Sequence, residues 1–314
     1  MLAATVQDKQ LIVEQRPDPE PGHGEVLVRV RAAGINGADI HQLGGNYPAP
    51  PGSPPDIPGL ELAGEVVARG PGAERFTEGD RVMAIVGGGG QAELAVVHER
   101  VLMPVPEELS WTEAGGVPEV FTTAHDAIFT QADLRAGERL LVHGGAGGVG
   151  TAAIQLGHAA GARVTATVRN PDLREPVSAF GANVIPHDEG FAEAGPFDVI
   201  LELVGAVNLT ENLMALNTGG RITVIGMGGG AKGEINLGLL LVKRGRIHGS
   251  TLRSRPLEGK ALTARGVERS VLPLLASGAV KVPIAETYSL SEAPAAYEHF
   301  QGGGKLGKII LVME

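Results

Sequence analysis

The first third of the chain has a hydrophobic pattern that predicts β-strands. From Glu25 to Arg31 apolar and polar side chains largely alternate, as expected of a strand with one buried face. Residues 61–69 and 81–86 are further candidate strands. Residues 44–58 carry six prolines and three glycines, and residues 87–90 are all glycine, so both segments predict loops.

The pattern changes near Trp111, where helical and strand-like segments begin to alternate. Such alternation predicts a parallel sheet with helices on both faces. The apolar run 237–242 predicts a core helix, because it is far too short to cross a membrane. The predicted helices are 112–130, 148–160 and 171–180, one after residue 258 and one from Ser291; the predicted strands are 139–143, 163–168, 198–203, 221–225, a short one around Val280, and 308–312.

These elements predict an α/β protein of two domains. A doubly wound parallel-sheet domain at residues 118–258 is inserted into a β-rich domain formed by residues 1–117 and 259–314. The length of 314 residues suits two domains of ordinary size.

Composition and charge exclude several classes of function. A net charge of −10 is a poor match for nucleic acid or for an anionic membrane surface. The chain has no cysteine, which excludes disulfides, thiolate nucleophiles and cysteine-containing zinc sites. Its nine histidines are scattered, and His143 is expected to pack or hydrogen-bond rather than to bind metal. The first residues do not resemble a signal peptide, so we expect a cytoplasmic protein.

A glycine-rich turn at residues 144–150 is the sharpest local signal. An apolar strand runs into Gly145-x-Gly147-x-x-Gly150, and a helical segment follows. In this context the early glycines let backbone N–H groups approach a pyrophosphate, and the last glycine lets helix and strand pack closely. The turn therefore predicts a dinucleotide site, against the plainer possibility of a structural turn.

The end of the second predicted strand indicates which dinucleotide is bound. An NAD site usually has an acidic residue there to bond the ribose hydroxyls. This chain instead has Arg169, with Arg174 shortly after it, and a guanidinium can grip a 2′-phosphate with two hydrogen bonds. We therefore favour NADPH over the alternative that Arg169 is a solvated loop arginine.

Motifs spread along the whole chain carry a family resemblance. Together they resemble the zinc-less, zeta-crystallin-like quinone oxidoreductases of the medium-chain dehydrogenase/reductase superfamily, and most of all the tumour-suppressor-inducible subgroup. The resemblance implies a Rossmann domain inserted into a GroES-like catalytic domain. The matching segments are 34–39, 44–48, 59–61, 64–67, 79–82, 118–124, the glycine turn, 226–230, 252–255 and 307–310.

Departures from the zinc-containing relatives are equally informative. Zinc alcohol dehydrogenases have a cysteine where this chain has Asn36 and a histidine where it has Leu60. Their structural zinc loop has no counterpart here. The resemblance therefore implies catalysis without a metal.

The resemblance also implies site residues, with the nicotinamide in a cleft between the domains. Tyr47 and Asn36 are the expected catalytic residues on the substrate side. His187 stands where relatives carry a tyrosine near the adenosine phosphate, which leaves that contact open. The expected cofactor-binding residues are Asn36, Thr123, Gly147, Gly148, Val149, Arg169, Arg174, Val204, Gly205, Ile225, Met227, Leu252 and Lys308.

The implied activity is reduction of a quinone-like small molecule by NADPH, which supplies hydride while the protein positions it. Tyr47, Asn36 or a water would stabilise the negative charge that develops on the acceptor oxygen. Two alternatives stay open: an enone or enoyl-thioester reductase on the same fold, and an NADPH-binding protein with little turnover. The physiological acceptor and the choice between one- and two-electron transfer are also open. A homodimer is expected, because dimers are usual among relatives.

Overall fold

The computed structural model describes residues 1–313 and divides into two compact units. One, here called the terminal unit, is formed by Met1–Thr122 and Leu252–Glu314, and the other, the inserted unit, is Thr123–Thr251. The inserted unit thus begins within helix α3 (Pro118–His125) and returns the chain to the terminal unit just before a turn at residues 252–255.

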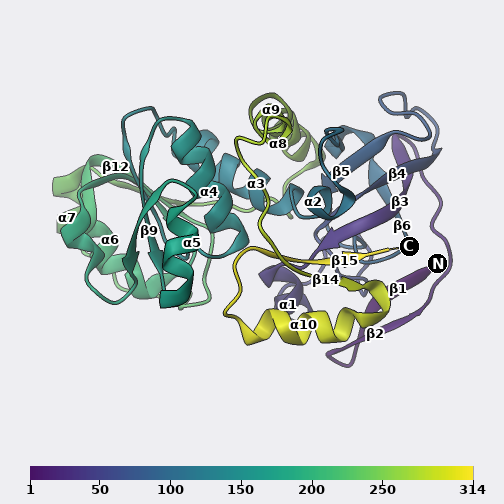
Figure 1. Cartoon of the computed structure of the whole chain (residues 1–314), viewed down its shortest axis with the longest axis horizontal. Coiled ribbons are helices and arrows are strands. Elements are labelled where there is room, and N and C mark those ends of the chain that lie inside the picture. The colour runs from purple at the N-terminus through teal and green to yellow at the C-terminus, as the bar shows by residue number, and fades with distance from the viewer. Residues whose placement is uncertain (314) are drawn as a thin grey trace. The chain divides into compact units, whose positions relative to one another are not determined.

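The terminal unit is built on a seven-stranded sheet (Figure 1). Six strands run in the order β14-β15-β3-β4-β5-β7, and β6 pairs with β3. A separate antiparallel hairpin joins β1 (Leu2–Gln7) to β2 (Gln10–Gln15). The sheet strands are β3 (Glu25–Gly34), β4 (Glu61–Arg69), β5 (Arg81–Ile85), β6 (Leu94–His98), β7 (Met103–Pro104), β14 (Ile284–Ser289) and β15 (Lys308–Val312). The helices are α1 (Gly37–Leu43), α2 (Trp111–Gly115), α8 (Leu257–Ser270), α9 (Leu272–Ala276) and α10 (Ala293–Gly302).

The core of the terminal unit follows from the alternation along its strands. Val26, Val28 and Val30 of β3 are at most 1% exposed, while Arg29 between them lies at the surface. They pack in one cluster with Leu62 of β4 and with Tyr297 of α10. The strands predicted at 25–31, 61–69 and 81–86 are therefore confirmed.

The inserted unit is a six-stranded, fully parallel sheet in the order β10-β9-β8-β11-β12-β13. The chain starts in the middle at β8, moves out through β9 and β10, and then crosses to β11, β12 and β13, which is the doubly wound arrangement predicted. Its strands are β8 (Arg139–Val142), β9 (Arg163–Val168), β10 (Ala182–Pro186), β11 (Phe197–Glu202), β12 (Leu216–Val224) and β13 (Arg246–Gly249), and its helices are α4 (Gly148–Ala159), α5 (Arg174–Ser178), α6 (Leu209–Ala215) and α7 (Leu237–Lys243).

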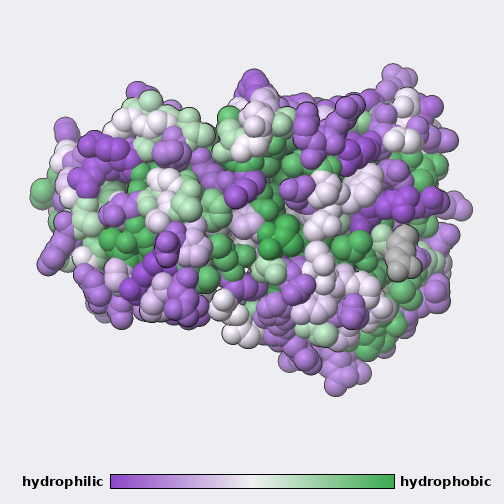
Figure 2. All heavy atoms as spheres, in the orientation of Figure 1, coloured by the Kyte–Doolittle hydropathy of each residue, from purple (hydrophilic) through white to green (hydrophobic). Residues whose placement is uncertain are grey.

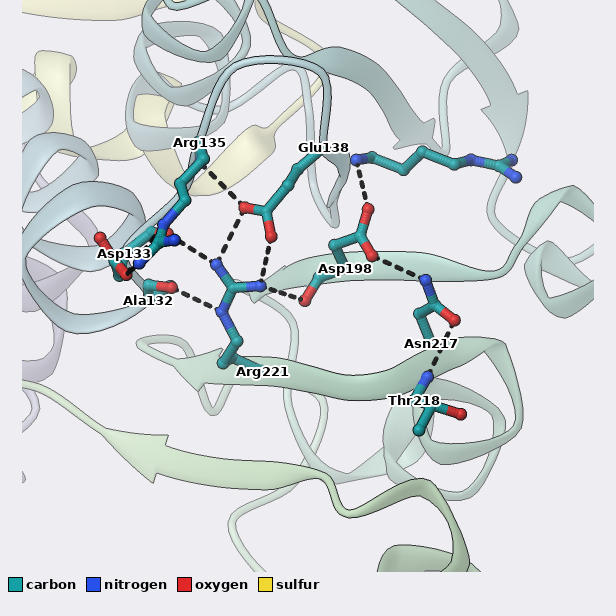
Figure 3. A network of polar contacts seen from close by, with 9 residues as sticks. Ala132, Asp133, Arg135, Glu138, Asp198, Asn217, Thr218 and Arg221 are labelled. Carbon is teal, nitrogen blue, oxygen red and sulfur yellow. Dashed lines mark hydrogen bonds and ion pairs between the residues drawn. The ribbon is translucent and has the colours of Figure 1, made fainter.

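The amino ends of the central strands are tied by a buried arginine, Arg221 of β12 (Figure 3). Its guanidinium donates to both carboxylate oxygens of Glu138 at 2.8 and 2.9 Å, and to the carbonyls of Ala132 and Asp133 at 2.6 and 2.7 Å. It also reaches the carbonyl of Asp198 on β11 at 3.3 Å. This edge of the sheet therefore carries structural contacts, and the opposite, carboxyl edge is left for ligands.

Several predicted elements differ from the structure. The helix predicted at 112–130 is three pieces, α2, α3 and a π-helical segment (Asp126–Gln131). Gly115, Gly116 and Pro118 account for the break between α2 and α3. The helix predicted at 171–180 is a 3-10 turn followed by the five residues of α5. The strand predicted around Val280 is wrong: the strand there is β14, which begins at Ile284.

Helix α7 is also not the core helix that its apolar run predicts. Leu237, Leu241 and Val242 are 68%, 76% and 71% exposed. Apolar residues on all sides of a seven-residue helix give no indication of which side is covered. The prediction of a core helix was wrong because it inferred burial from apolar composition alone. Hydrophobic residues are scattered over the visible surface as well (Figure 2). None of the helices described within residues 1–313 has the length and apolarity needed to span a membrane.

Candidate functional site

The glycine turn joins β8 to the N-terminus of α4, as the sequence predicts. Gly144 has a positive φ of 66°, which favours glycine. A Cβ on Gly150 would lie 2.4 Å from the Gly144 carbonyl oxygen, and one on Gly145 would lie 2.9 Å from the Ala166 side chain. Gly147 is the N-cap of the twelve-residue α4 and is exposed. The first N–H groups of α4 therefore have an open, small-residue approach, which suits an anion.

Strand order places this turn where a nucleotide is expected. From β8 the chain runs to β9 on one side, while β11 pairs on the other, so the carboxyl ends of β8 and β11 flank the topological switch point. In open α/β sheets, ligands bind in the crevice outside these ends. The half-buried Gly148 and Val149 begin α4 at the same edge.

The end of β9 brings together the two predicted arginines. Arg169 follows the strand directly and is exposed. Arg174 opens α5 and its Nε donates to the carbonyl of Val168 at 3.4 Å, which holds the base of its guanidinium beside the strand end. No acidic residue stands at the strand end, since Asn170 follows Arg169 and caps the next turn through its side chain. His187, after β10, is half-exposed, and its Nδ1 lies 3.5 Å from Oδ1 of Asp188.

The end of β11 is organised by Glu202, which the sequence reasoning missed. Its side chain is buried and accepts hydrogen bonds from the backbone N–H groups of Val204 and Gly205 at 2.6 and 2.8 Å. Asn212 of α6 donates to its other oxygen at 2.7 Å. The predicted residues Val204 and Gly205 are therefore held in place by a carboxylate. An acidic residue at the carboxyl end of an apolar strand was the available signal.

His143 joins the same buried network through hydrogen bonds, as expected of a packing or hydrogen-bonding residue. Nδ1 lies 3.1 Å from the Thr167 hydroxyl, and Nε2 lies 2.8 Å from Oδ1 of Asn212. Burial lowers the pKa of His143, although the nearby Glu202 opposes this shift. These contacts link the ends of β8, β9 and β11.

The remaining predicted residues of the inserted unit lie at the end of β12 and on α3. Ile225 follows β12, and its N–H donates to the carbonyl of Glu202 at 2.9 Å. Met227 is 64% exposed, on the glycine-rich segment after the strand. Thr123 is buried on α3.

In the terminal unit, Asn36 is held by a buried ion pair. Lys308 of β15 donates to Oε1 of Glu61 and to Oδ1 of Asn36, both at 2.5 Å, and to the carbonyl of Ile35 at 3.1 Å. The amide nitrogen of Asn36 donates to the same Glu61 oxygen at 2.9 Å and to the carbonyl of Gly34 at 3.3 Å. All three ammonium hydrogens of Lys308 and both amide hydrogens of Asn36 are thereby used.

Asp39 lies in the same buried region and supports the start of α1. Its carboxylate accepts from the backbone N–H groups of Asn36 and Gly59 at 2.8 and 3.1 Å. Burial raises the pKa of Asp39 to about 7, against the opposing effect of these two hydrogen bonds. Asp39 and Glu61 therefore both hold neighbouring groups in place.

Tyr47 and Leu252 contact the loops of the terminal unit. Tyr47 is half-buried, and its ring lies 4.7 Å from the guanidinium carbon of Arg253. Leu252 lines a small pocket with Thr122, Lys260 and Met103. Oγ1 of Thr122 is buried there without a hydrogen-bond partner among the described residues.

The described residues contain no group of three or more histidine, aspartate or glutamate side chains placed to hold a metal ion. Leu60, at the position of a zinc-ligand histidine in zinc-containing relatives, is 4% exposed and apolar.

Comparison with known proteins decides the family. Residues 22–107 match the family described as alcohol dehydrogenase GroES-like domain, and residues 148–266 match the family described as zinc-binding dehydrogenase. The chain is 33% identical over 310 residues to a quinone oxidoreductase of Rattus norvegicus, covering 94% of this chain and 91% of the relative. The chain belongs to the quinone oxidoreductase family of the medium-chain dehydrogenases/reductases.

Solved structures agree with this family. An alcohol dehydrogenase superfamily protein from Novosphingobium aromaticivorans has a TM-score of 0.90 and 30% identity, with 100% of both chains covered. A mycobacterial quinone oxidoreductase has a TM-score of 0.87 and 25% identity, with 99% of both chains covered. As a member of the quinone oxidoreductase family, the chain is an oxidoreductase that uses a nicotinamide cofactor. The finer resemblance to the tumour-suppressor-inducible subgroup stays a prediction.

Proposed function

We propose that this chain uses NADPH to reduce quinones and related electron-poor carbonyl compounds, without a metal. The observation that carries the proposal is the identity with a quinone oxidoreductase along 94% of the chain. We assign dinucleotide binding to the Rossmann domain, residues 118–258, and the acceptor side to the GroES-like domain formed by residues 1–117 and 259–314.

The inserted unit offers groups that fit such a cofactor. We propose that Gly147, Gly148 and Val149 contact the pyrophosphate, since a side chain at Gly147 would meet only one atom, at 3.5 Å, and the N-terminus of α4 favours an anion. Val204 and Gly205 would contact the adenosine, and Thr123, Ile225 and Met227 would lie near the nicotinamide. We propose the same role for Leu252, which belongs to the terminal unit. NADPH bound there would supply a hydride to the acceptor.

Selection of NADPH rests on Arg169 and Arg174. Both lie at the carboxyl end of β9, where an NAD site carries an acid. Arg169 is exposed and Arg174 is anchored only through its Nε, so the outer nitrogens of both guanidiniums can meet the 2′-phosphate. An acid in their place would repel that group.

Tyr47 is the better of the two candidates for stabilising charge on the acceptor oxygen. Both amide hydrogens of Asn36 already donate within the protein, so its side chain has no spare donor. We therefore propose that Tyr47 donates through its hydroxyl, and that Asn36 shapes the site. Lys308 has no free donor either, and we propose that it acts on the cofactor only through its grip on Asn36.

Metal independence is supported by the residue types present. The chain has no cysteine, and the positions of two zinc ligands hold Asn36 and Leu60. A zinc site needs nitrogen, sulfur or carboxylate ligands, and here the Asn36 amide is engaged by an ammonium group instead. A quinone is already electrophilic, so it does not need a Lewis acid.

An acceptor panel tests this function. Steady-state oxidation of NADPH is measured with a benzoquinone, a naphthoquinone, a simple enone and no acceptor. Oxidation that depends on the quinones supports the proposal. Oxidation with the enone alone would favour enone reduction, and tight NADPH binding with no oxidation would identify a binding protein; either result rejects the proposal.

We also propose that the protein is a homodimer. Strand β13 is at the edge of the parallel sheet, and the exposed Leu237, Leu241 and Val242 of α7 precede it in the chain. An unpaired sheet edge beside apolar side chains suits pairing with a second copy. Sedimentation equilibrium should give the mass of two chains, and the mass of one chain would exclude it. A cytoplasmic location likewise stays a prediction.

A further inference from the structure

Arg253 occupies the turn at residues 252–255, which is closed by a hydrogen bond of 3.1 Å from the N–H of Arg255 to the carbonyl of Leu252. Although the turn is short and its neighbour Ser254 is exposed, the Arg253 side chain is only 4% exposed. A buried arginine in a turn requires partners for its donors.

Each nitrogen of the Arg253 guanidinium donates to a different segment of the terminal unit. Nε donates to the carbonyl of Gly87 at 2.8 Å, Nη1 to the carbonyl of Tyr47 at 2.9 Å, and Nη2 to Oε1 of Gln42 at 2.5 Å. The guanidinium also lies over the Tyr47 ring. One rigid group therefore joins the end of α1, the proline-rich loop and the glycine loop.

The contacts continue beyond the guanidinium. The Gln42 amide, which accepts from Arg253, donates to the carbonyl of Pro55 at 3.4 Å. The two loops also pack closely, because a Cβ on Gly87 would lie 2.1 Å from the hydroxyl of Ser53. The 44–58 loop has no helix or strand of its own, so it is held by tertiary contacts. The Arg253 contacts hold its first part, and the Val6 N–H, which donates to the carbonyl of Asp56 at 2.7 Å, holds its end.

The positively charged guanidinium of Arg253 is hydrogen-bonded to neutral groups. Its three hydrogen-bond acceptors are two carbonyls and an amide oxygen, and burial lowers its pKa, opposed by Tyr47 and Asp39. Burial of a cation among neutral acceptors is costly, and it is tolerated where it fixes a geometry.

We propose that Arg253 is a positioning residue that fixes Tyr47 and the 42–58 segment for contact with the acceptor. The proposal deepens the proposed function, on which it rests for the role of Tyr47. Loss of the clamp should reduce kcat/KM for a quinone by about ten- to a hundredfold, because a displacement near 1 Å can cost that much. Affinity for NADPH should change less than about twofold, since the three residues that accept from Arg253, namely Gln42, Tyr47 and Gly87, are not among those assigned to the cofactor.

Hydrogen exchange tests the clamp without reference to activity. The backbone N–H groups of Ser53 and Gly89 donate to carbonyls at 3.1 and 2.8 Å and should be protected in the parent. Arg253→Ala should speed exchange in residues 42–58 and 87–90. Arg253→Lys should speed exchange less than Arg253→Ala, because an ammonium group can keep part of the hydrogen bonding but cannot reach all three acceptors in a plane. The lysine variant also serves as the folded variant if the alanine chain is unstable.

Arg75→Ala is the matched control for these variants. Arg75 also donates to a carbonyl, that of Leu102 at 2.9 Å, and lies 4.8 Å from the ring of Phe76, elsewhere in the terminal unit. The Arg75→Ala variant should leave hydrogen exchange in residues 42–58 and 87–90 unchanged. The clamp is disproved if Arg253→Lys and Arg253→Ala leave these two segments as protected as in the parent.

A double-mutant cycle connects the clamp to Tyr47. If Arg253 acts through Tyr47, then Tyr47→Phe should reduce turnover in the parent but much less in the Arg253→Lys background. Full additivity would show that Arg253 does not act through Tyr47. If Tyr47→Phe has no effect in the parent, the substrate role of Tyr47 fails, while the exchange result still decides whether the clamp exists.

Discussion

Nζ of Lys308 lies 2.5 Å from Oε1 of Glu61, and the two side chains are 3% and 0% exposed. The pair joins β15, at one end of the chain, to β4 near the other. The second Glu61 oxygen accepts from the backbone N–H of Glu119 at 2.8 Å. This ion pair therefore holds three distant segments and the side chain of Asn36 in one arrangement.

Lys308→Met should lower the free energy of unfolding by about 3–5 kcal/mol, because it leaves the Glu61 carboxylate buried without its cation. Glu61→Leu alone should cost a similar amount for the reverse reason. The double variant should be more stable than the sum of the two losses predicts. Urea unfolding of the four chains measures this, and simple additivity would show that the two side chains do not interact.

Asp39 predicts a dependence of stability on pH that is opposite to that of a salt-bridged carboxylate. Burial raises the pKa of Asp39 in the folded chain to about 7, against the ordinary value of 3.8 for an aspartate side chain. As pH rises from about 4 to 7, the unfolded chain releases this proton first, so stability falls, by an amount on the order of 4 kcal/mol, and is level above 7.

Asp39→Asn should remove this fall, because the amide resembles the protonated carboxyl at every pH. The measurement is urea unfolding of parent and variant between pH 4.5 and 8. The difference in unfolding free energy between them should grow with pH in favour of the variant. A constant difference would mean that Asp39 is ionised throughout this range.

Two glycines of the turn are expected to have different roles, Gly150 in packing and Gly147 in cofactor binding. Gly150→Ala places a Cβ 2.4 Å from the Gly144 carbonyl oxygen, so it should destabilise the fold. A Cβ in Gly147→Ala meets only that oxygen, at 3.5 Å, so the loss of stability should be limited to the N-cap preference for glycine over alanine, about 1 kcal/mol, while NADPH affinity falls about tenfold or more. Thermal unfolding and NADPH titration distinguish the two, and an unchanged affinity in Gly147→Ala would place the pyrophosphate elsewhere.

Local sequence was sufficient for the central strands of the terminal unit and for this turn. Strong alternation predicted β3 and β4, and the glycine spacing between β8 and α4 requires only local geometry. The residue types at Arg169 and Arg174 likewise identified a charged strand end, where the structure places both.

Long-range contacts were beyond the reach of the sequence pattern. Lys308 was expected to contact the cofactor. Its ammonium group donates hydrogen bonds to Asn36 and Glu61, which lie about 250–270 positions earlier in the chain. The clamp of Arg253 and the carboxylate of Glu202 depend equally on pairings between distant segments. The exposure of α7 shows the same limit, because an apolar run does not say which of its sides is covered.

Arg169→Glu should remove most of the preference for NADPH over NADH. One charged phosphate contact is worth about 1.5–3 kcal/mol, which corresponds to a ten- to hundredfold preference for NADPH. The variant loses the cation and adds repulsion, so most of that preference should disappear. Catalytic efficiency with NADPH and NADH is measured for both chains, with the exposed Arg163→Glu at the opposite end of β9 as control. Equal catalytic efficiency with both cofactors in the parent would show that Arg169 has no role in cofactor choice.

Chelator treatment distinguishes metal-independent, quinone-dependent oxidation of NADPH from zinc-dependent catalysis. Protein purified without added metal is dialysed against a chelator, and NADPH oxidation is followed with and without a quinone. We predict that oxidation depends on the quinone and that its rate equals that of the undialysed protein. Loss of activity on dialysis, restored by stoichiometric zinc, or oxidation that does not respond to the quinone would contradict it.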